Sequence, residues 1–233
     1  MPKKESISNC VTCPIRHVSI FAGLTSEEIK NLDVPVIKVT YEPGEVLYHE
    51  SGKTLSAFTI YSGVVKLLRS LPNGRNQIVR LLSTGDIFGF EGLIEDHYHH
   101  TAVAINQTLV CRLSLPELTS LSREHASVRE ALVQRWATAL RQAEQLVMEM
   151  GSKKAAERLA AFLLHWCQHA QQDNWTPLPL TRQELGELLG LTVETVSRFL
   201  AEWKRLGLLE EKGGQIRIQR TAELQARTEG ARL

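Results

Sequence analysis

The sequence contains two cysteines close together near its N-terminus, as Cys10-Val-Thr-Cys13. Of the other two, Cys111 lies in a stretch typical of a β-strand, and Cys167 lies on an apolar helix face, which indicates a core position. In a reducing compartment a close pair more often binds a metal or undergoes redox chemistry than forms a structural disulfide. A single Cys-x-x-Cys is nevertheless a weak metal signal, so a purely structural role stays open.

A second group of informative residues lies near the C-terminus. Thr181 is a suitable N-cap for a helix that ends at Gly190, and Thr192 is a suitable N-cap for a helix over Val193–Leu206. Two short helices joined by a tight turn are typical of a helix-turn-helix. The following LLEEKGGQIRIQ, with Gly213-Gly214 at its tip, predicts a hairpin of the kind called a wing.

The start of the second helix carries side chains suited to reading base edges. Arg donates to guanine, Glu accepts from cytosine, and Ser bonds either way, so we expect the base-reading residues to be Val193, Glu194, Ser197 and Arg198. Residues expected to contact DNA phosphates are Thr181, Arg182, Lys204, Lys212 and Arg217. The alternatives are a helical hairpin in an ordinary core, or, for the charged residues, plain solvated surface positions.

The elements that must position these residues begin with a long helix, expected from about Ser127 to Gly151. Apolar residues recur along it at spacings of 4, 3, 4, 3 and 4, namely Leu132, Trp136, Ala139, Ala143, Leu146 and Met150. This a/d heptad predicts a coiled-coil interface with a second copy of the chain. The alternative is an amphipathic helix packed only on its own domain.

The segment from about Val34 to Leu115 has a different texture. Short β-branched runs alternate with glycine turns such as Pro43-Gly44, Asn73-Gly74 and Thr84-Gly85, which is typical of a jelly roll or small barrel. A short helix is expected over residues 25 to 32. The fold class is therefore predicted as α+β: a β-roll, a long dimerisation helix and a C-terminal winged helix-turn-helix.

Composition excludes several classes of protein. The hydrophobic fraction of 43% and charged fraction of 23% are ordinary for a globular domain, and no apolar run is long enough to span a bilayer. The N-terminus has no apolar region typical of a signal peptide, so we expect a cytoplasmic protein without a membrane partner. With 27 basic against 26 acidic residues, a DNA surface must be a local patch. No nucleophile–base pair, phosphate loop or HExxH motif indicates an enzyme.

The order of barrel, heptad helix and winged helix resembles the CRP/FNR family of bacterial transcription regulators. The resemblance covers nearly the full chain and includes TRQELGELLGLTVETVSRFL and the glycine motifs Pro43-Gly44-Glu45, Ser62-Gly63 and Gly85-Asp86. It implies a cyclic-nucleotide-binding-type β-roll, a homodimer, double-stranded DNA as partner and contact with RNA polymerase. The domains expected are an N-terminal Cys-containing arm (1–22), the sensor (23–118), the dimerisation helix (119–151) and the DNA-binding domain (152–233).

Cyclic AMP is not expected as the effector. In members that bind it, a glutamate meets the ribose and an arginine pairs with the phosphate. Glu91 matches that glutamate here, but His100 stands where the arginine is expected. The phosphate would therefore lose a charge-assisted bidentate contact.

The FNR branch is more similar. LTVETVSR resembles its recognition helix, which implies that Glu194, Ser197 and Arg198 read a TTGAT-type half-site. FNR-type oxygen sensors hold a [4Fe-4S] cluster on three N-terminal cysteines and one strand cysteine. Cys10, Cys13 and Cys111 match three of these, whereas the remaining one aligns near Ser19.

Several inputs therefore stay open. His17 is the candidate fourth ligand of an iron–sulfur cluster. The alternatives are a redox-active Cys10–Cys13 pair, a haem or nitric-oxide sensor using His97, His99 or His100, a different small-molecule effector, or no cofactor. The sequence predicts a DNA-binding regulator that responds to oxygen, redox state or nitric oxide. A sensor or scaffold that does not bind DNA is the rival class.

Overall fold

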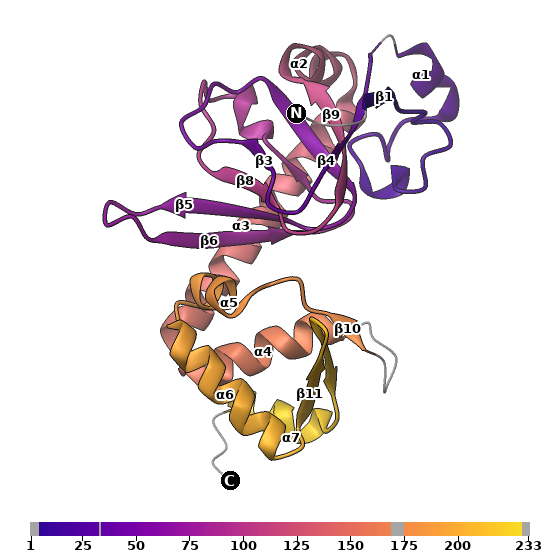
Figure 1. Ribbon diagram of the computed structural model, residues 1–233. Coiled ribbons are helices and arrows are strands. Elements are labelled where there is room, and N and C mark those ends of the chain that lie inside the picture. Colours follow the sequence, from indigo (N-terminus) through magenta and orange to yellow (C-terminus); the bar gives the residue numbers. More distant parts are fainter. Residues whose placement is uncertain (1–4, 33, 169–174, 230–233) are drawn as a thin grey trace. The chain divides into compact units, whose positions relative to one another are not determined.

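The computed structural model describes residues 5–32, 34–168 and 175–229 (Figure 1). The chain forms two compact units, Met1–Leu140 and Arg141–Leu233. The boundary falls inside the long helix α3 (Ala126–Ser152), and each unit is described by itself. The four-part domain division expected from the sequence stays a prediction. No helix in the described ranges is both long and apolar enough to cross a membrane.

The first unit contains a roll of two antiparallel sheets. One sheet has the strand order β1-β2-β9-β4-β7 and the other has the order β3-β8-β5-β6. The strands are β1 (Glu5–Ile7), β2 (Ile37–Tyr41), β3 (Val46–Tyr48), β4 (Ser56–Ser62), β5 (Val65–Ser70), β6 (Asn76–Leu82), β7 (Ile87–Phe88), β8 (Thr101–Ala104) and β9 (Thr108–Ser114). This confirms the β-roll predicted from the glycine-punctuated runs.

Two of those glycines show why the turns need them. Gly63 has φ +100°, and a Cβ there would lie 2.7 Å from the Cα of Thr108, so a side chain fits neither the backbone nor the space. Gly74 has φ +78° and donates its N–H to the Leu71 carbonyl at 2.9 Å, which closes the β5–β6 turn. Between the sheets, fully buried apolar side chains such as Val39, Ile60 and Val110 form one core.

A second core joins the N-terminal arm to the helices. Thr25 and Ser114 form capping boxes that start α1 (Ser26–Asn31) and α2 (Leu115–Glu124). Apolar residues of the arm and of these helices pack together with the start of α3. The arm is more ordered than its polar sequence suggests: β1 pairs with β2, and a 3-10 turn spans Arg16–Val18.

The second unit is a winged helix. Its elements are α4 (Ala155–Cys167), β10 (Thr176–Pro177), α5 (Arg182–Leu189), α6 (Val193–Arg205), β11 (Leu209–Lys212), β12 (Gln215–Ile218), α7 (Thr221–Ala226) and a final 3-10 turn (Arg227–Glu229). Strands β10, β12 and β11 form a small antiparallel sheet. Leu159, Leu185, Leu200 and Trp203, from α4, α5 and α6, are fully buried. Cys167 is buried, as predicted.

Candidate DNA interface and cysteine pocket

The turn between α5 and α6 has the geometry of a helix-turn-helix. The Thr181 hydroxyl accepts the Glu184 N–H at 3.2 Å, while the Glu184 carboxylate accepts the Thr181 N–H at 2.8 Å. Gly190 ends α5 in the left-handed region at φ +62°. A Cβ at Gly186 would lie 2.6 Å from the Leu191 carbonyl oxygen, so the chain can turn this tightly only over a glycine.

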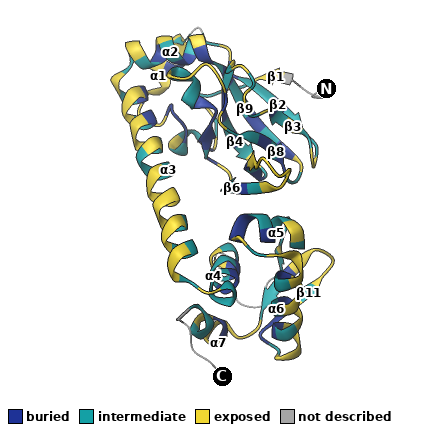
Figure 2. Cartoon of the chain, turned by 90° about the vertical axis from the view of Figure 1, so that its left-hand side faces the viewer, coloured by how far each residue is buried: buried dark blue, intermediate teal, exposed yellow. Residues whose placement is uncertain are grey.

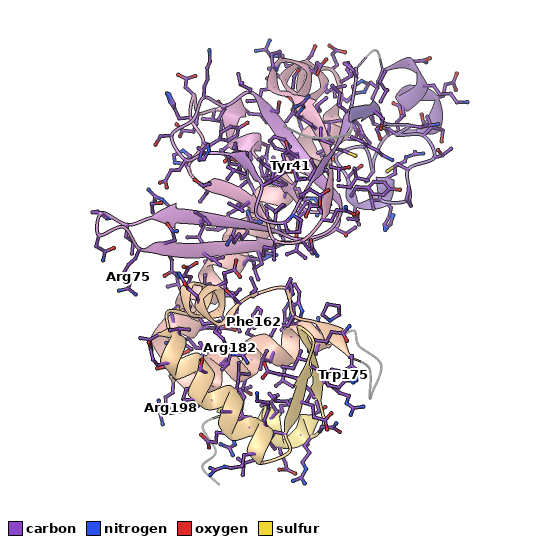
Figure 3. All side chains as sticks on the ribbon, in the orientation of Figure 1. Tyr41, Arg75, Phe162, Trp175, Arg182 and Arg198 are labelled. Atoms are coloured by element: carbon purple, nitrogen blue, oxygen red, sulfur yellow. The ribbon has the colours of Figure 1, made fainter. Side chains whose placement is uncertain are left out.

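Helix α6 separates an apolar face from a polar one. Val196, Leu200 and Trp203 are fully buried, which fixes the rotation of the helix. The four residues predicted to read bases, Val193, Glu194, Ser197 and Arg198, are all exposed. Arg198 projects outward from α6 (Figure 3), and its guanidinium lies 5.3 Å from the Phe199 ring centroid. The exposure and the position at the helix start fit major-groove reading, which stays a prediction.

Three of the predicted phosphate contacts are bound to glutamates of the wing. Arg182 and Lys204 both pair with Glu211, each at 2.8 Å. Arg217 pairs with Glu210 at 2.7 Å, and its guanidinium lies over the Trp175 ring. Lys212 is exposed beside the glycines of the wing tip. The sequence did not predict these acidic partners, although the Leu-Glu-Glu-Lys stretch that forms β11 shows two glutamates in the wing.

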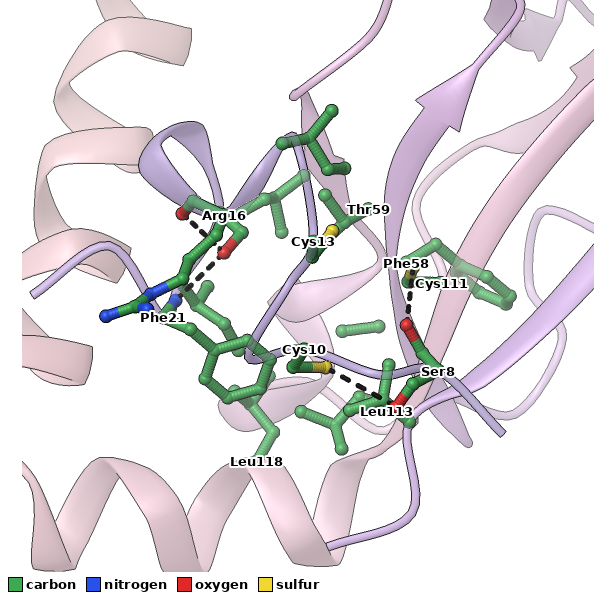
Figure 4. Close-up of a pocket in the computed structure, with 16 residues that line it drawn as sticks. Ser8, Cys10, Cys13, Arg16, Phe21, Phe58, Thr59, Cys111, Leu113 and Leu118 are labelled. Carbon is green, nitrogen blue, oxygen red and sulfur yellow. Dashed lines mark hydrogen bonds between the residues drawn. The ribbon is translucent and has the colours of Figure 1, made fainter. Parts of the chain in front are cut away.

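The cysteine pocket is defined here by Cys10, Cys13 and Cys111, which line one cavity between the arm and the sheet (Figure 4). Cys111 lies in β9, between β2 and β4, opposite Lys38 on one side and Thr59 on the other. Ser8 links the two sides: its hydroxyl lies 4.0 Å from the Cys111 sulfur, and its carbonyl oxygen lies 4.0 Å from the Cys10 sulfur. The structure thus brings together three of the four predicted metal ligands.

The surroundings of the pocket keep at least two of the thiols protonated. Burial raises the pKa of Cys111 to about 11 and also raises the pKa of Cys10. The neighbouring walls are mostly apolar and include Phe21, Phe58 and Leu113. The cavity has about 30 Å³ of water-accessible space, room for about two water molecules. A multi-atom cluster does not fit unless the arm moves.

The fourth predicted ligand lies elsewhere. His17 is exposed, does not line the pocket, and places its Nδ1 3.1 Å from the Pro14 carbonyl oxygen. Ser19 does line the pocket, but its hydroxyl donates to the Arg16 carbonyl and accepts the Phe21 N–H. Within the described ranges, no group of three or more His, Cys, Asp or Glu residues is placed to hold a metal ion. These residues therefore do not fit a four-ligand [4Fe-4S] site in this conformation.

The interior of the β-roll is filled with aromatic rings. Tyr48 stacks on Tyr98 at 3.8 Å between centroids, and Tyr98 is fixed because its hydroxyl donates to the Ser56 carbonyl at 2.8 Å. His100, at the position where cyclic-AMP-binding members have an arginine, is held neutral because burial lowers its pKa to about 4. A neutral imidazole is a poor partner for a cyclic phosphate, in keeping with the expectation that cyclic AMP is not the effector. The other two haem-ligand candidates, His97 and His99, are exposed.

Many residues of helix α3 are exposed (Figure 2), and several of them are large and apolar. Leu132, expected at an interface, is instead 3% exposed and belongs to the core of its own unit. Its neighbour Val133 is 61% exposed. The large apolar residues exposed on the helix are Val133, Trp136, Leu140, Val147 and Met148. Of the six residues predicted for the interface, only Leu132 is buried, and Trp136 and Ala143 lie exposed on the same side as the larger apolar residues.

Comparisons with known proteins agree with this architecture. Residues 38–125 match the family described as the cyclic nucleotide-binding domain, and residues 157–227 match the Crp-like helix-turn-helix domain. The solved structure of FixK2 from Bradyrhizobium japonicum is 30% identical in sequence, with 81% of this chain and 95% of that chain aligned at a TM-score of 0.74. The chain belongs to the CRP/FNR family.

Alignments with curated relatives cover nearly the whole of this CRP/FNR regulator. The transcriptional regulatory protein btr of Bordetella pertussis is 28% identical over 94% of this chain and 92% of its own length. The fumarate and nitrate reduction regulatory protein of Escherichia coli K12 is 29% identical over 91% of this chain and 86% of its own length. The resemblance predicted from the sequence is confirmed. This CRP/FNR protein is a DNA-binding transcription regulator and not an enzyme.

Proposed function

We propose that this CRP/FNR regulator responds to oxygen, redox state or nitric oxide through the cysteine pocket, and that it binds a palindromic TTGAT-type site as a homodimer. The observation that carries the proposal is the convergence of Cys10, Cys13 and Cys111 on one cavity. Two of these thiols come from the arm and one from a strand inside the sheet. The three thiols are half-buried, and burial keeps Cys10 and Cys111 protonated, so metal binding or oxidation would require the arm to move and expose them as thiolates.

The dimer is proposed to form along α3. Val133, Leu140 and Val147 recur every seven residues and are all more than 60% exposed. Trp136 lies between the first two. Its ring centroid is 5.2 Å from that of Phe90, so packing within the unit already holds the indole beside this apolar row. A heptad row of large apolar residues left on the surface is the pattern that a second parallel helix buries. A second copy is therefore the occupant that this face fits.

Two copies related by a two-fold axis would present two α6 helices to one duplex. Half-sites one turn apart, roughly 34 Å, suit such a dimer. Glu194, Ser197 and Arg198 offer the acceptor and donor groups needed for a half-site with both G·C and A·T pairs. The TTGAT-type site and contact with RNA polymerase rest on the likeness to the FNR branch.

The chemistry at the pocket has two candidate forms. Metal binding would remove the protons that burial holds on Cys10 and Cys111, and a cluster would need the arm to move and a fourth ligand from elsewhere. Alternatively, two thiols lose two protons and two electrons to an oxidant such as a peroxide and form a disulfide. The described residues do not supply the four ligands that a [4Fe-4S] cluster needs. Nothing in the β-roll favours haem over these two.

A spectrum of anaerobically purified protein tests the proposal. A broad band near 400 nm that air bleaches, with iron and acid-labile sulfide, supports a cluster. A colourless protein supports a thiol switch if oxidation removes two titratable thiols and at the same time changes its affinity for DNA. The matched control is the Cys167→Ser variant, which leaves the pocket intact. If the protein is colourless and binds DNA equally well in reduced and oxidised form, the sensing part of the proposal is wrong.

A further inference from the structure

The carboxylate of Glu211 joins three elements of the winged helix. Its two oxygens accept hydrogen bonds from the two terminal nitrogens of Arg182, at 2.8 and 2.9 Å. The Lys204 ammonium lies 2.8 Å from the same carboxylate. Arg182 is the first residue of α5 and Lys204 lies in the last turn of α6, so a strand of the wing is bound to both helices.

The strand register explains why Glu211 faces the helices. Glu211 pairs with Ile216 of β12, which is fully buried, whereas its neighbours Glu210 and Lys212 are exposed. The Glu211 side chain is only 15% exposed. Burial alone raises its pKa, but the hydrogen bonds from Lys204 and Arg182 outweigh that effect, and the pKa is lower than usual. The carboxylate is therefore ionised at neutral pH.

The ion pairs change what Arg182 and Lys204 can offer to DNA. Two cations and one carboxylate leave one net positive charge where the sequence suggests two. A phosphate that approaches either cation must compete with a carboxylate already held at hydrogen-bond distance. A bidentate, partly buried pair is stronger than an exposed one, so this competition is not removed by solvent. Binding to phosphates contributes affinity for any DNA sequence and none of the discrimination between sequences.

We propose that Glu211 is a specificity-determining residue, which limits binding to DNA of any sequence by pairing with Arg182 and Lys204 and cancelling one of their two positive charges. The affinity that remains then depends more on the base-reading end of α6. The inference rests on DNA binding by the winged helix, and it is independent of the signal and of the operator sequence. The wing thus carries an acidic residue that limits phosphate binding, in addition to its basic residues Lys212 and Arg217.

The test measures the affinity of the full-length Glu211→Gln variant for a random-sequence duplex over a range of salt concentrations. We expect affinity at low salt to rise about tenfold. The slope of log K against log salt should steepen by about 0.9 for each additional phosphate contacted, with two freed cations setting the maximum. The charge-matched control is Glu223→Gln on α7, whose partner Arg220 lies outside the helix-turn-helix, and its slope should equal that of the wild type.

A second pair of variants covers the case in which Glu211→Gln does not fold, since that change leaves two cations facing each other. Lys204→Met is compared with Lys204→Met/Glu211→Gln, in which only Arg182 is freed. The double variant should again show a slope steeper by about 0.9 than its parent. Equal slopes in both pairs would overturn the proposal. A wild-type protein that binds no duplex at all would instead contradict the DNA-binding function.

Discussion

Arg135 of α3 donates a hydrogen bond from its guanidinium to the backbone carbonyl oxygen of Val18 in the N-terminal arm. Val18 also packs against Gly85, where a Cβ would approach a Val18 methyl to 2.7 Å. The arm segment that follows Cys13 is thus held between a sheet turn and the helix proposed to form the dimer. A change at the cysteine pocket therefore has a short covalent and hydrogen-bonded route to α3.

Removing this contact should loosen the arm. For Arg135→Gln we expect a loss of about 1.5–3 kcal/mol in the free energy of unfolding, the usual range for a hydrogen bond to a charged group. Alkylation of Cys10 and Cys13, followed by mass spectrometry, should become several-fold faster. Glu130→Gln, an exposed change on the same helix, serves as control. Unchanged alkylation rates in Arg135→Gln would show that the contact does not hold the arm.

Two leucines of α3, Leu132 and Leu140, differ in burial and should therefore have opposite roles. Leu140→Glu should leave the fold intact and shift the protein from dimer to monomer in sedimentation or light-scattering measurements, because Leu140 is 61% exposed on the monomer. Leu132→Ala should instead lower the free energy of unfolding by about 2–5 kcal/mol through a buried cavity. A Leu140→Glu protein that stays fully dimeric would place the interface elsewhere.

Arg198 is expected to contribute to sequence discrimination. Arg198→Ala should lose about 1–3 kcal/mol of affinity for a TTGAT-type site, or roughly 5- to 150-fold, and much less for a random duplex. Arg220→Ala removes an equal charge from the start of α7, away from α6, and should change both affinities little. Equal losses on both duplexes with Arg198→Ala would mean that the side chain contacts only phosphates.

His100 should make the fold sensitive to acid. The folded state keeps the ring neutral down to about pH 4, since burial and the nearby Arg69, His99 and Arg80 outweigh the opposing Glu50, whereas an unfolded histidine takes up a proton near pH 6.5. The free energy of unfolding is therefore unaffected by His100 above about pH 6.5, and it decreases as the pH falls toward 4 because only the unfolded state takes up the proton. In His100→Gln, the number of protons taken up on unfolding near pH 5 should fall by nearly one. Denaturant titrations at several pH values measure this, and an unchanged proton uptake would contradict it.

The elements fixed by local chemistry were predictable from the sequence. Helix α5 begins after Thr181 and ends at Gly190, as predicted, and Gly213-Gly214 forms the turn at the tip of the wing. Such caps and positive-φ turns depend on a few adjacent residues. On α3 the prediction was wrong for Leu132, which is buried in its own unit. Both the row of Leu132 and the row of Val133 are apolar, and only packing of the arm and α2 against the helix decides which is buried.

The candidate site divides in the same way. That Cys10, Cys13 and Cys111 share a pocket follows from the family resemblance, whereas the position of His17 outside it depends on the local 3-10 turn. The wing glutamates were visible in the sequence as charges. Their pairing with Arg182 and Lys204 depends on the strand register and on where two helix ends come to lie in the fold.

Cys111 sits in β9, flanked by hydrogen-bonded strands on both sides, whereas Cys10 and Cys13 belong to a peripheral loop. Amides in a central strand exchange with solvent only on deep opening of the domain, and peripheral segments exchange through small local fluctuations. The pocket therefore combines one thiol on a central strand with two on a loop of the arm, where local opening should be easier. The rate of deuterium uptake along residues 8 to 20 should therefore change when the pocket binds a metal or is oxidised. The slowly exchanging amides of β9 serve as the internal reference.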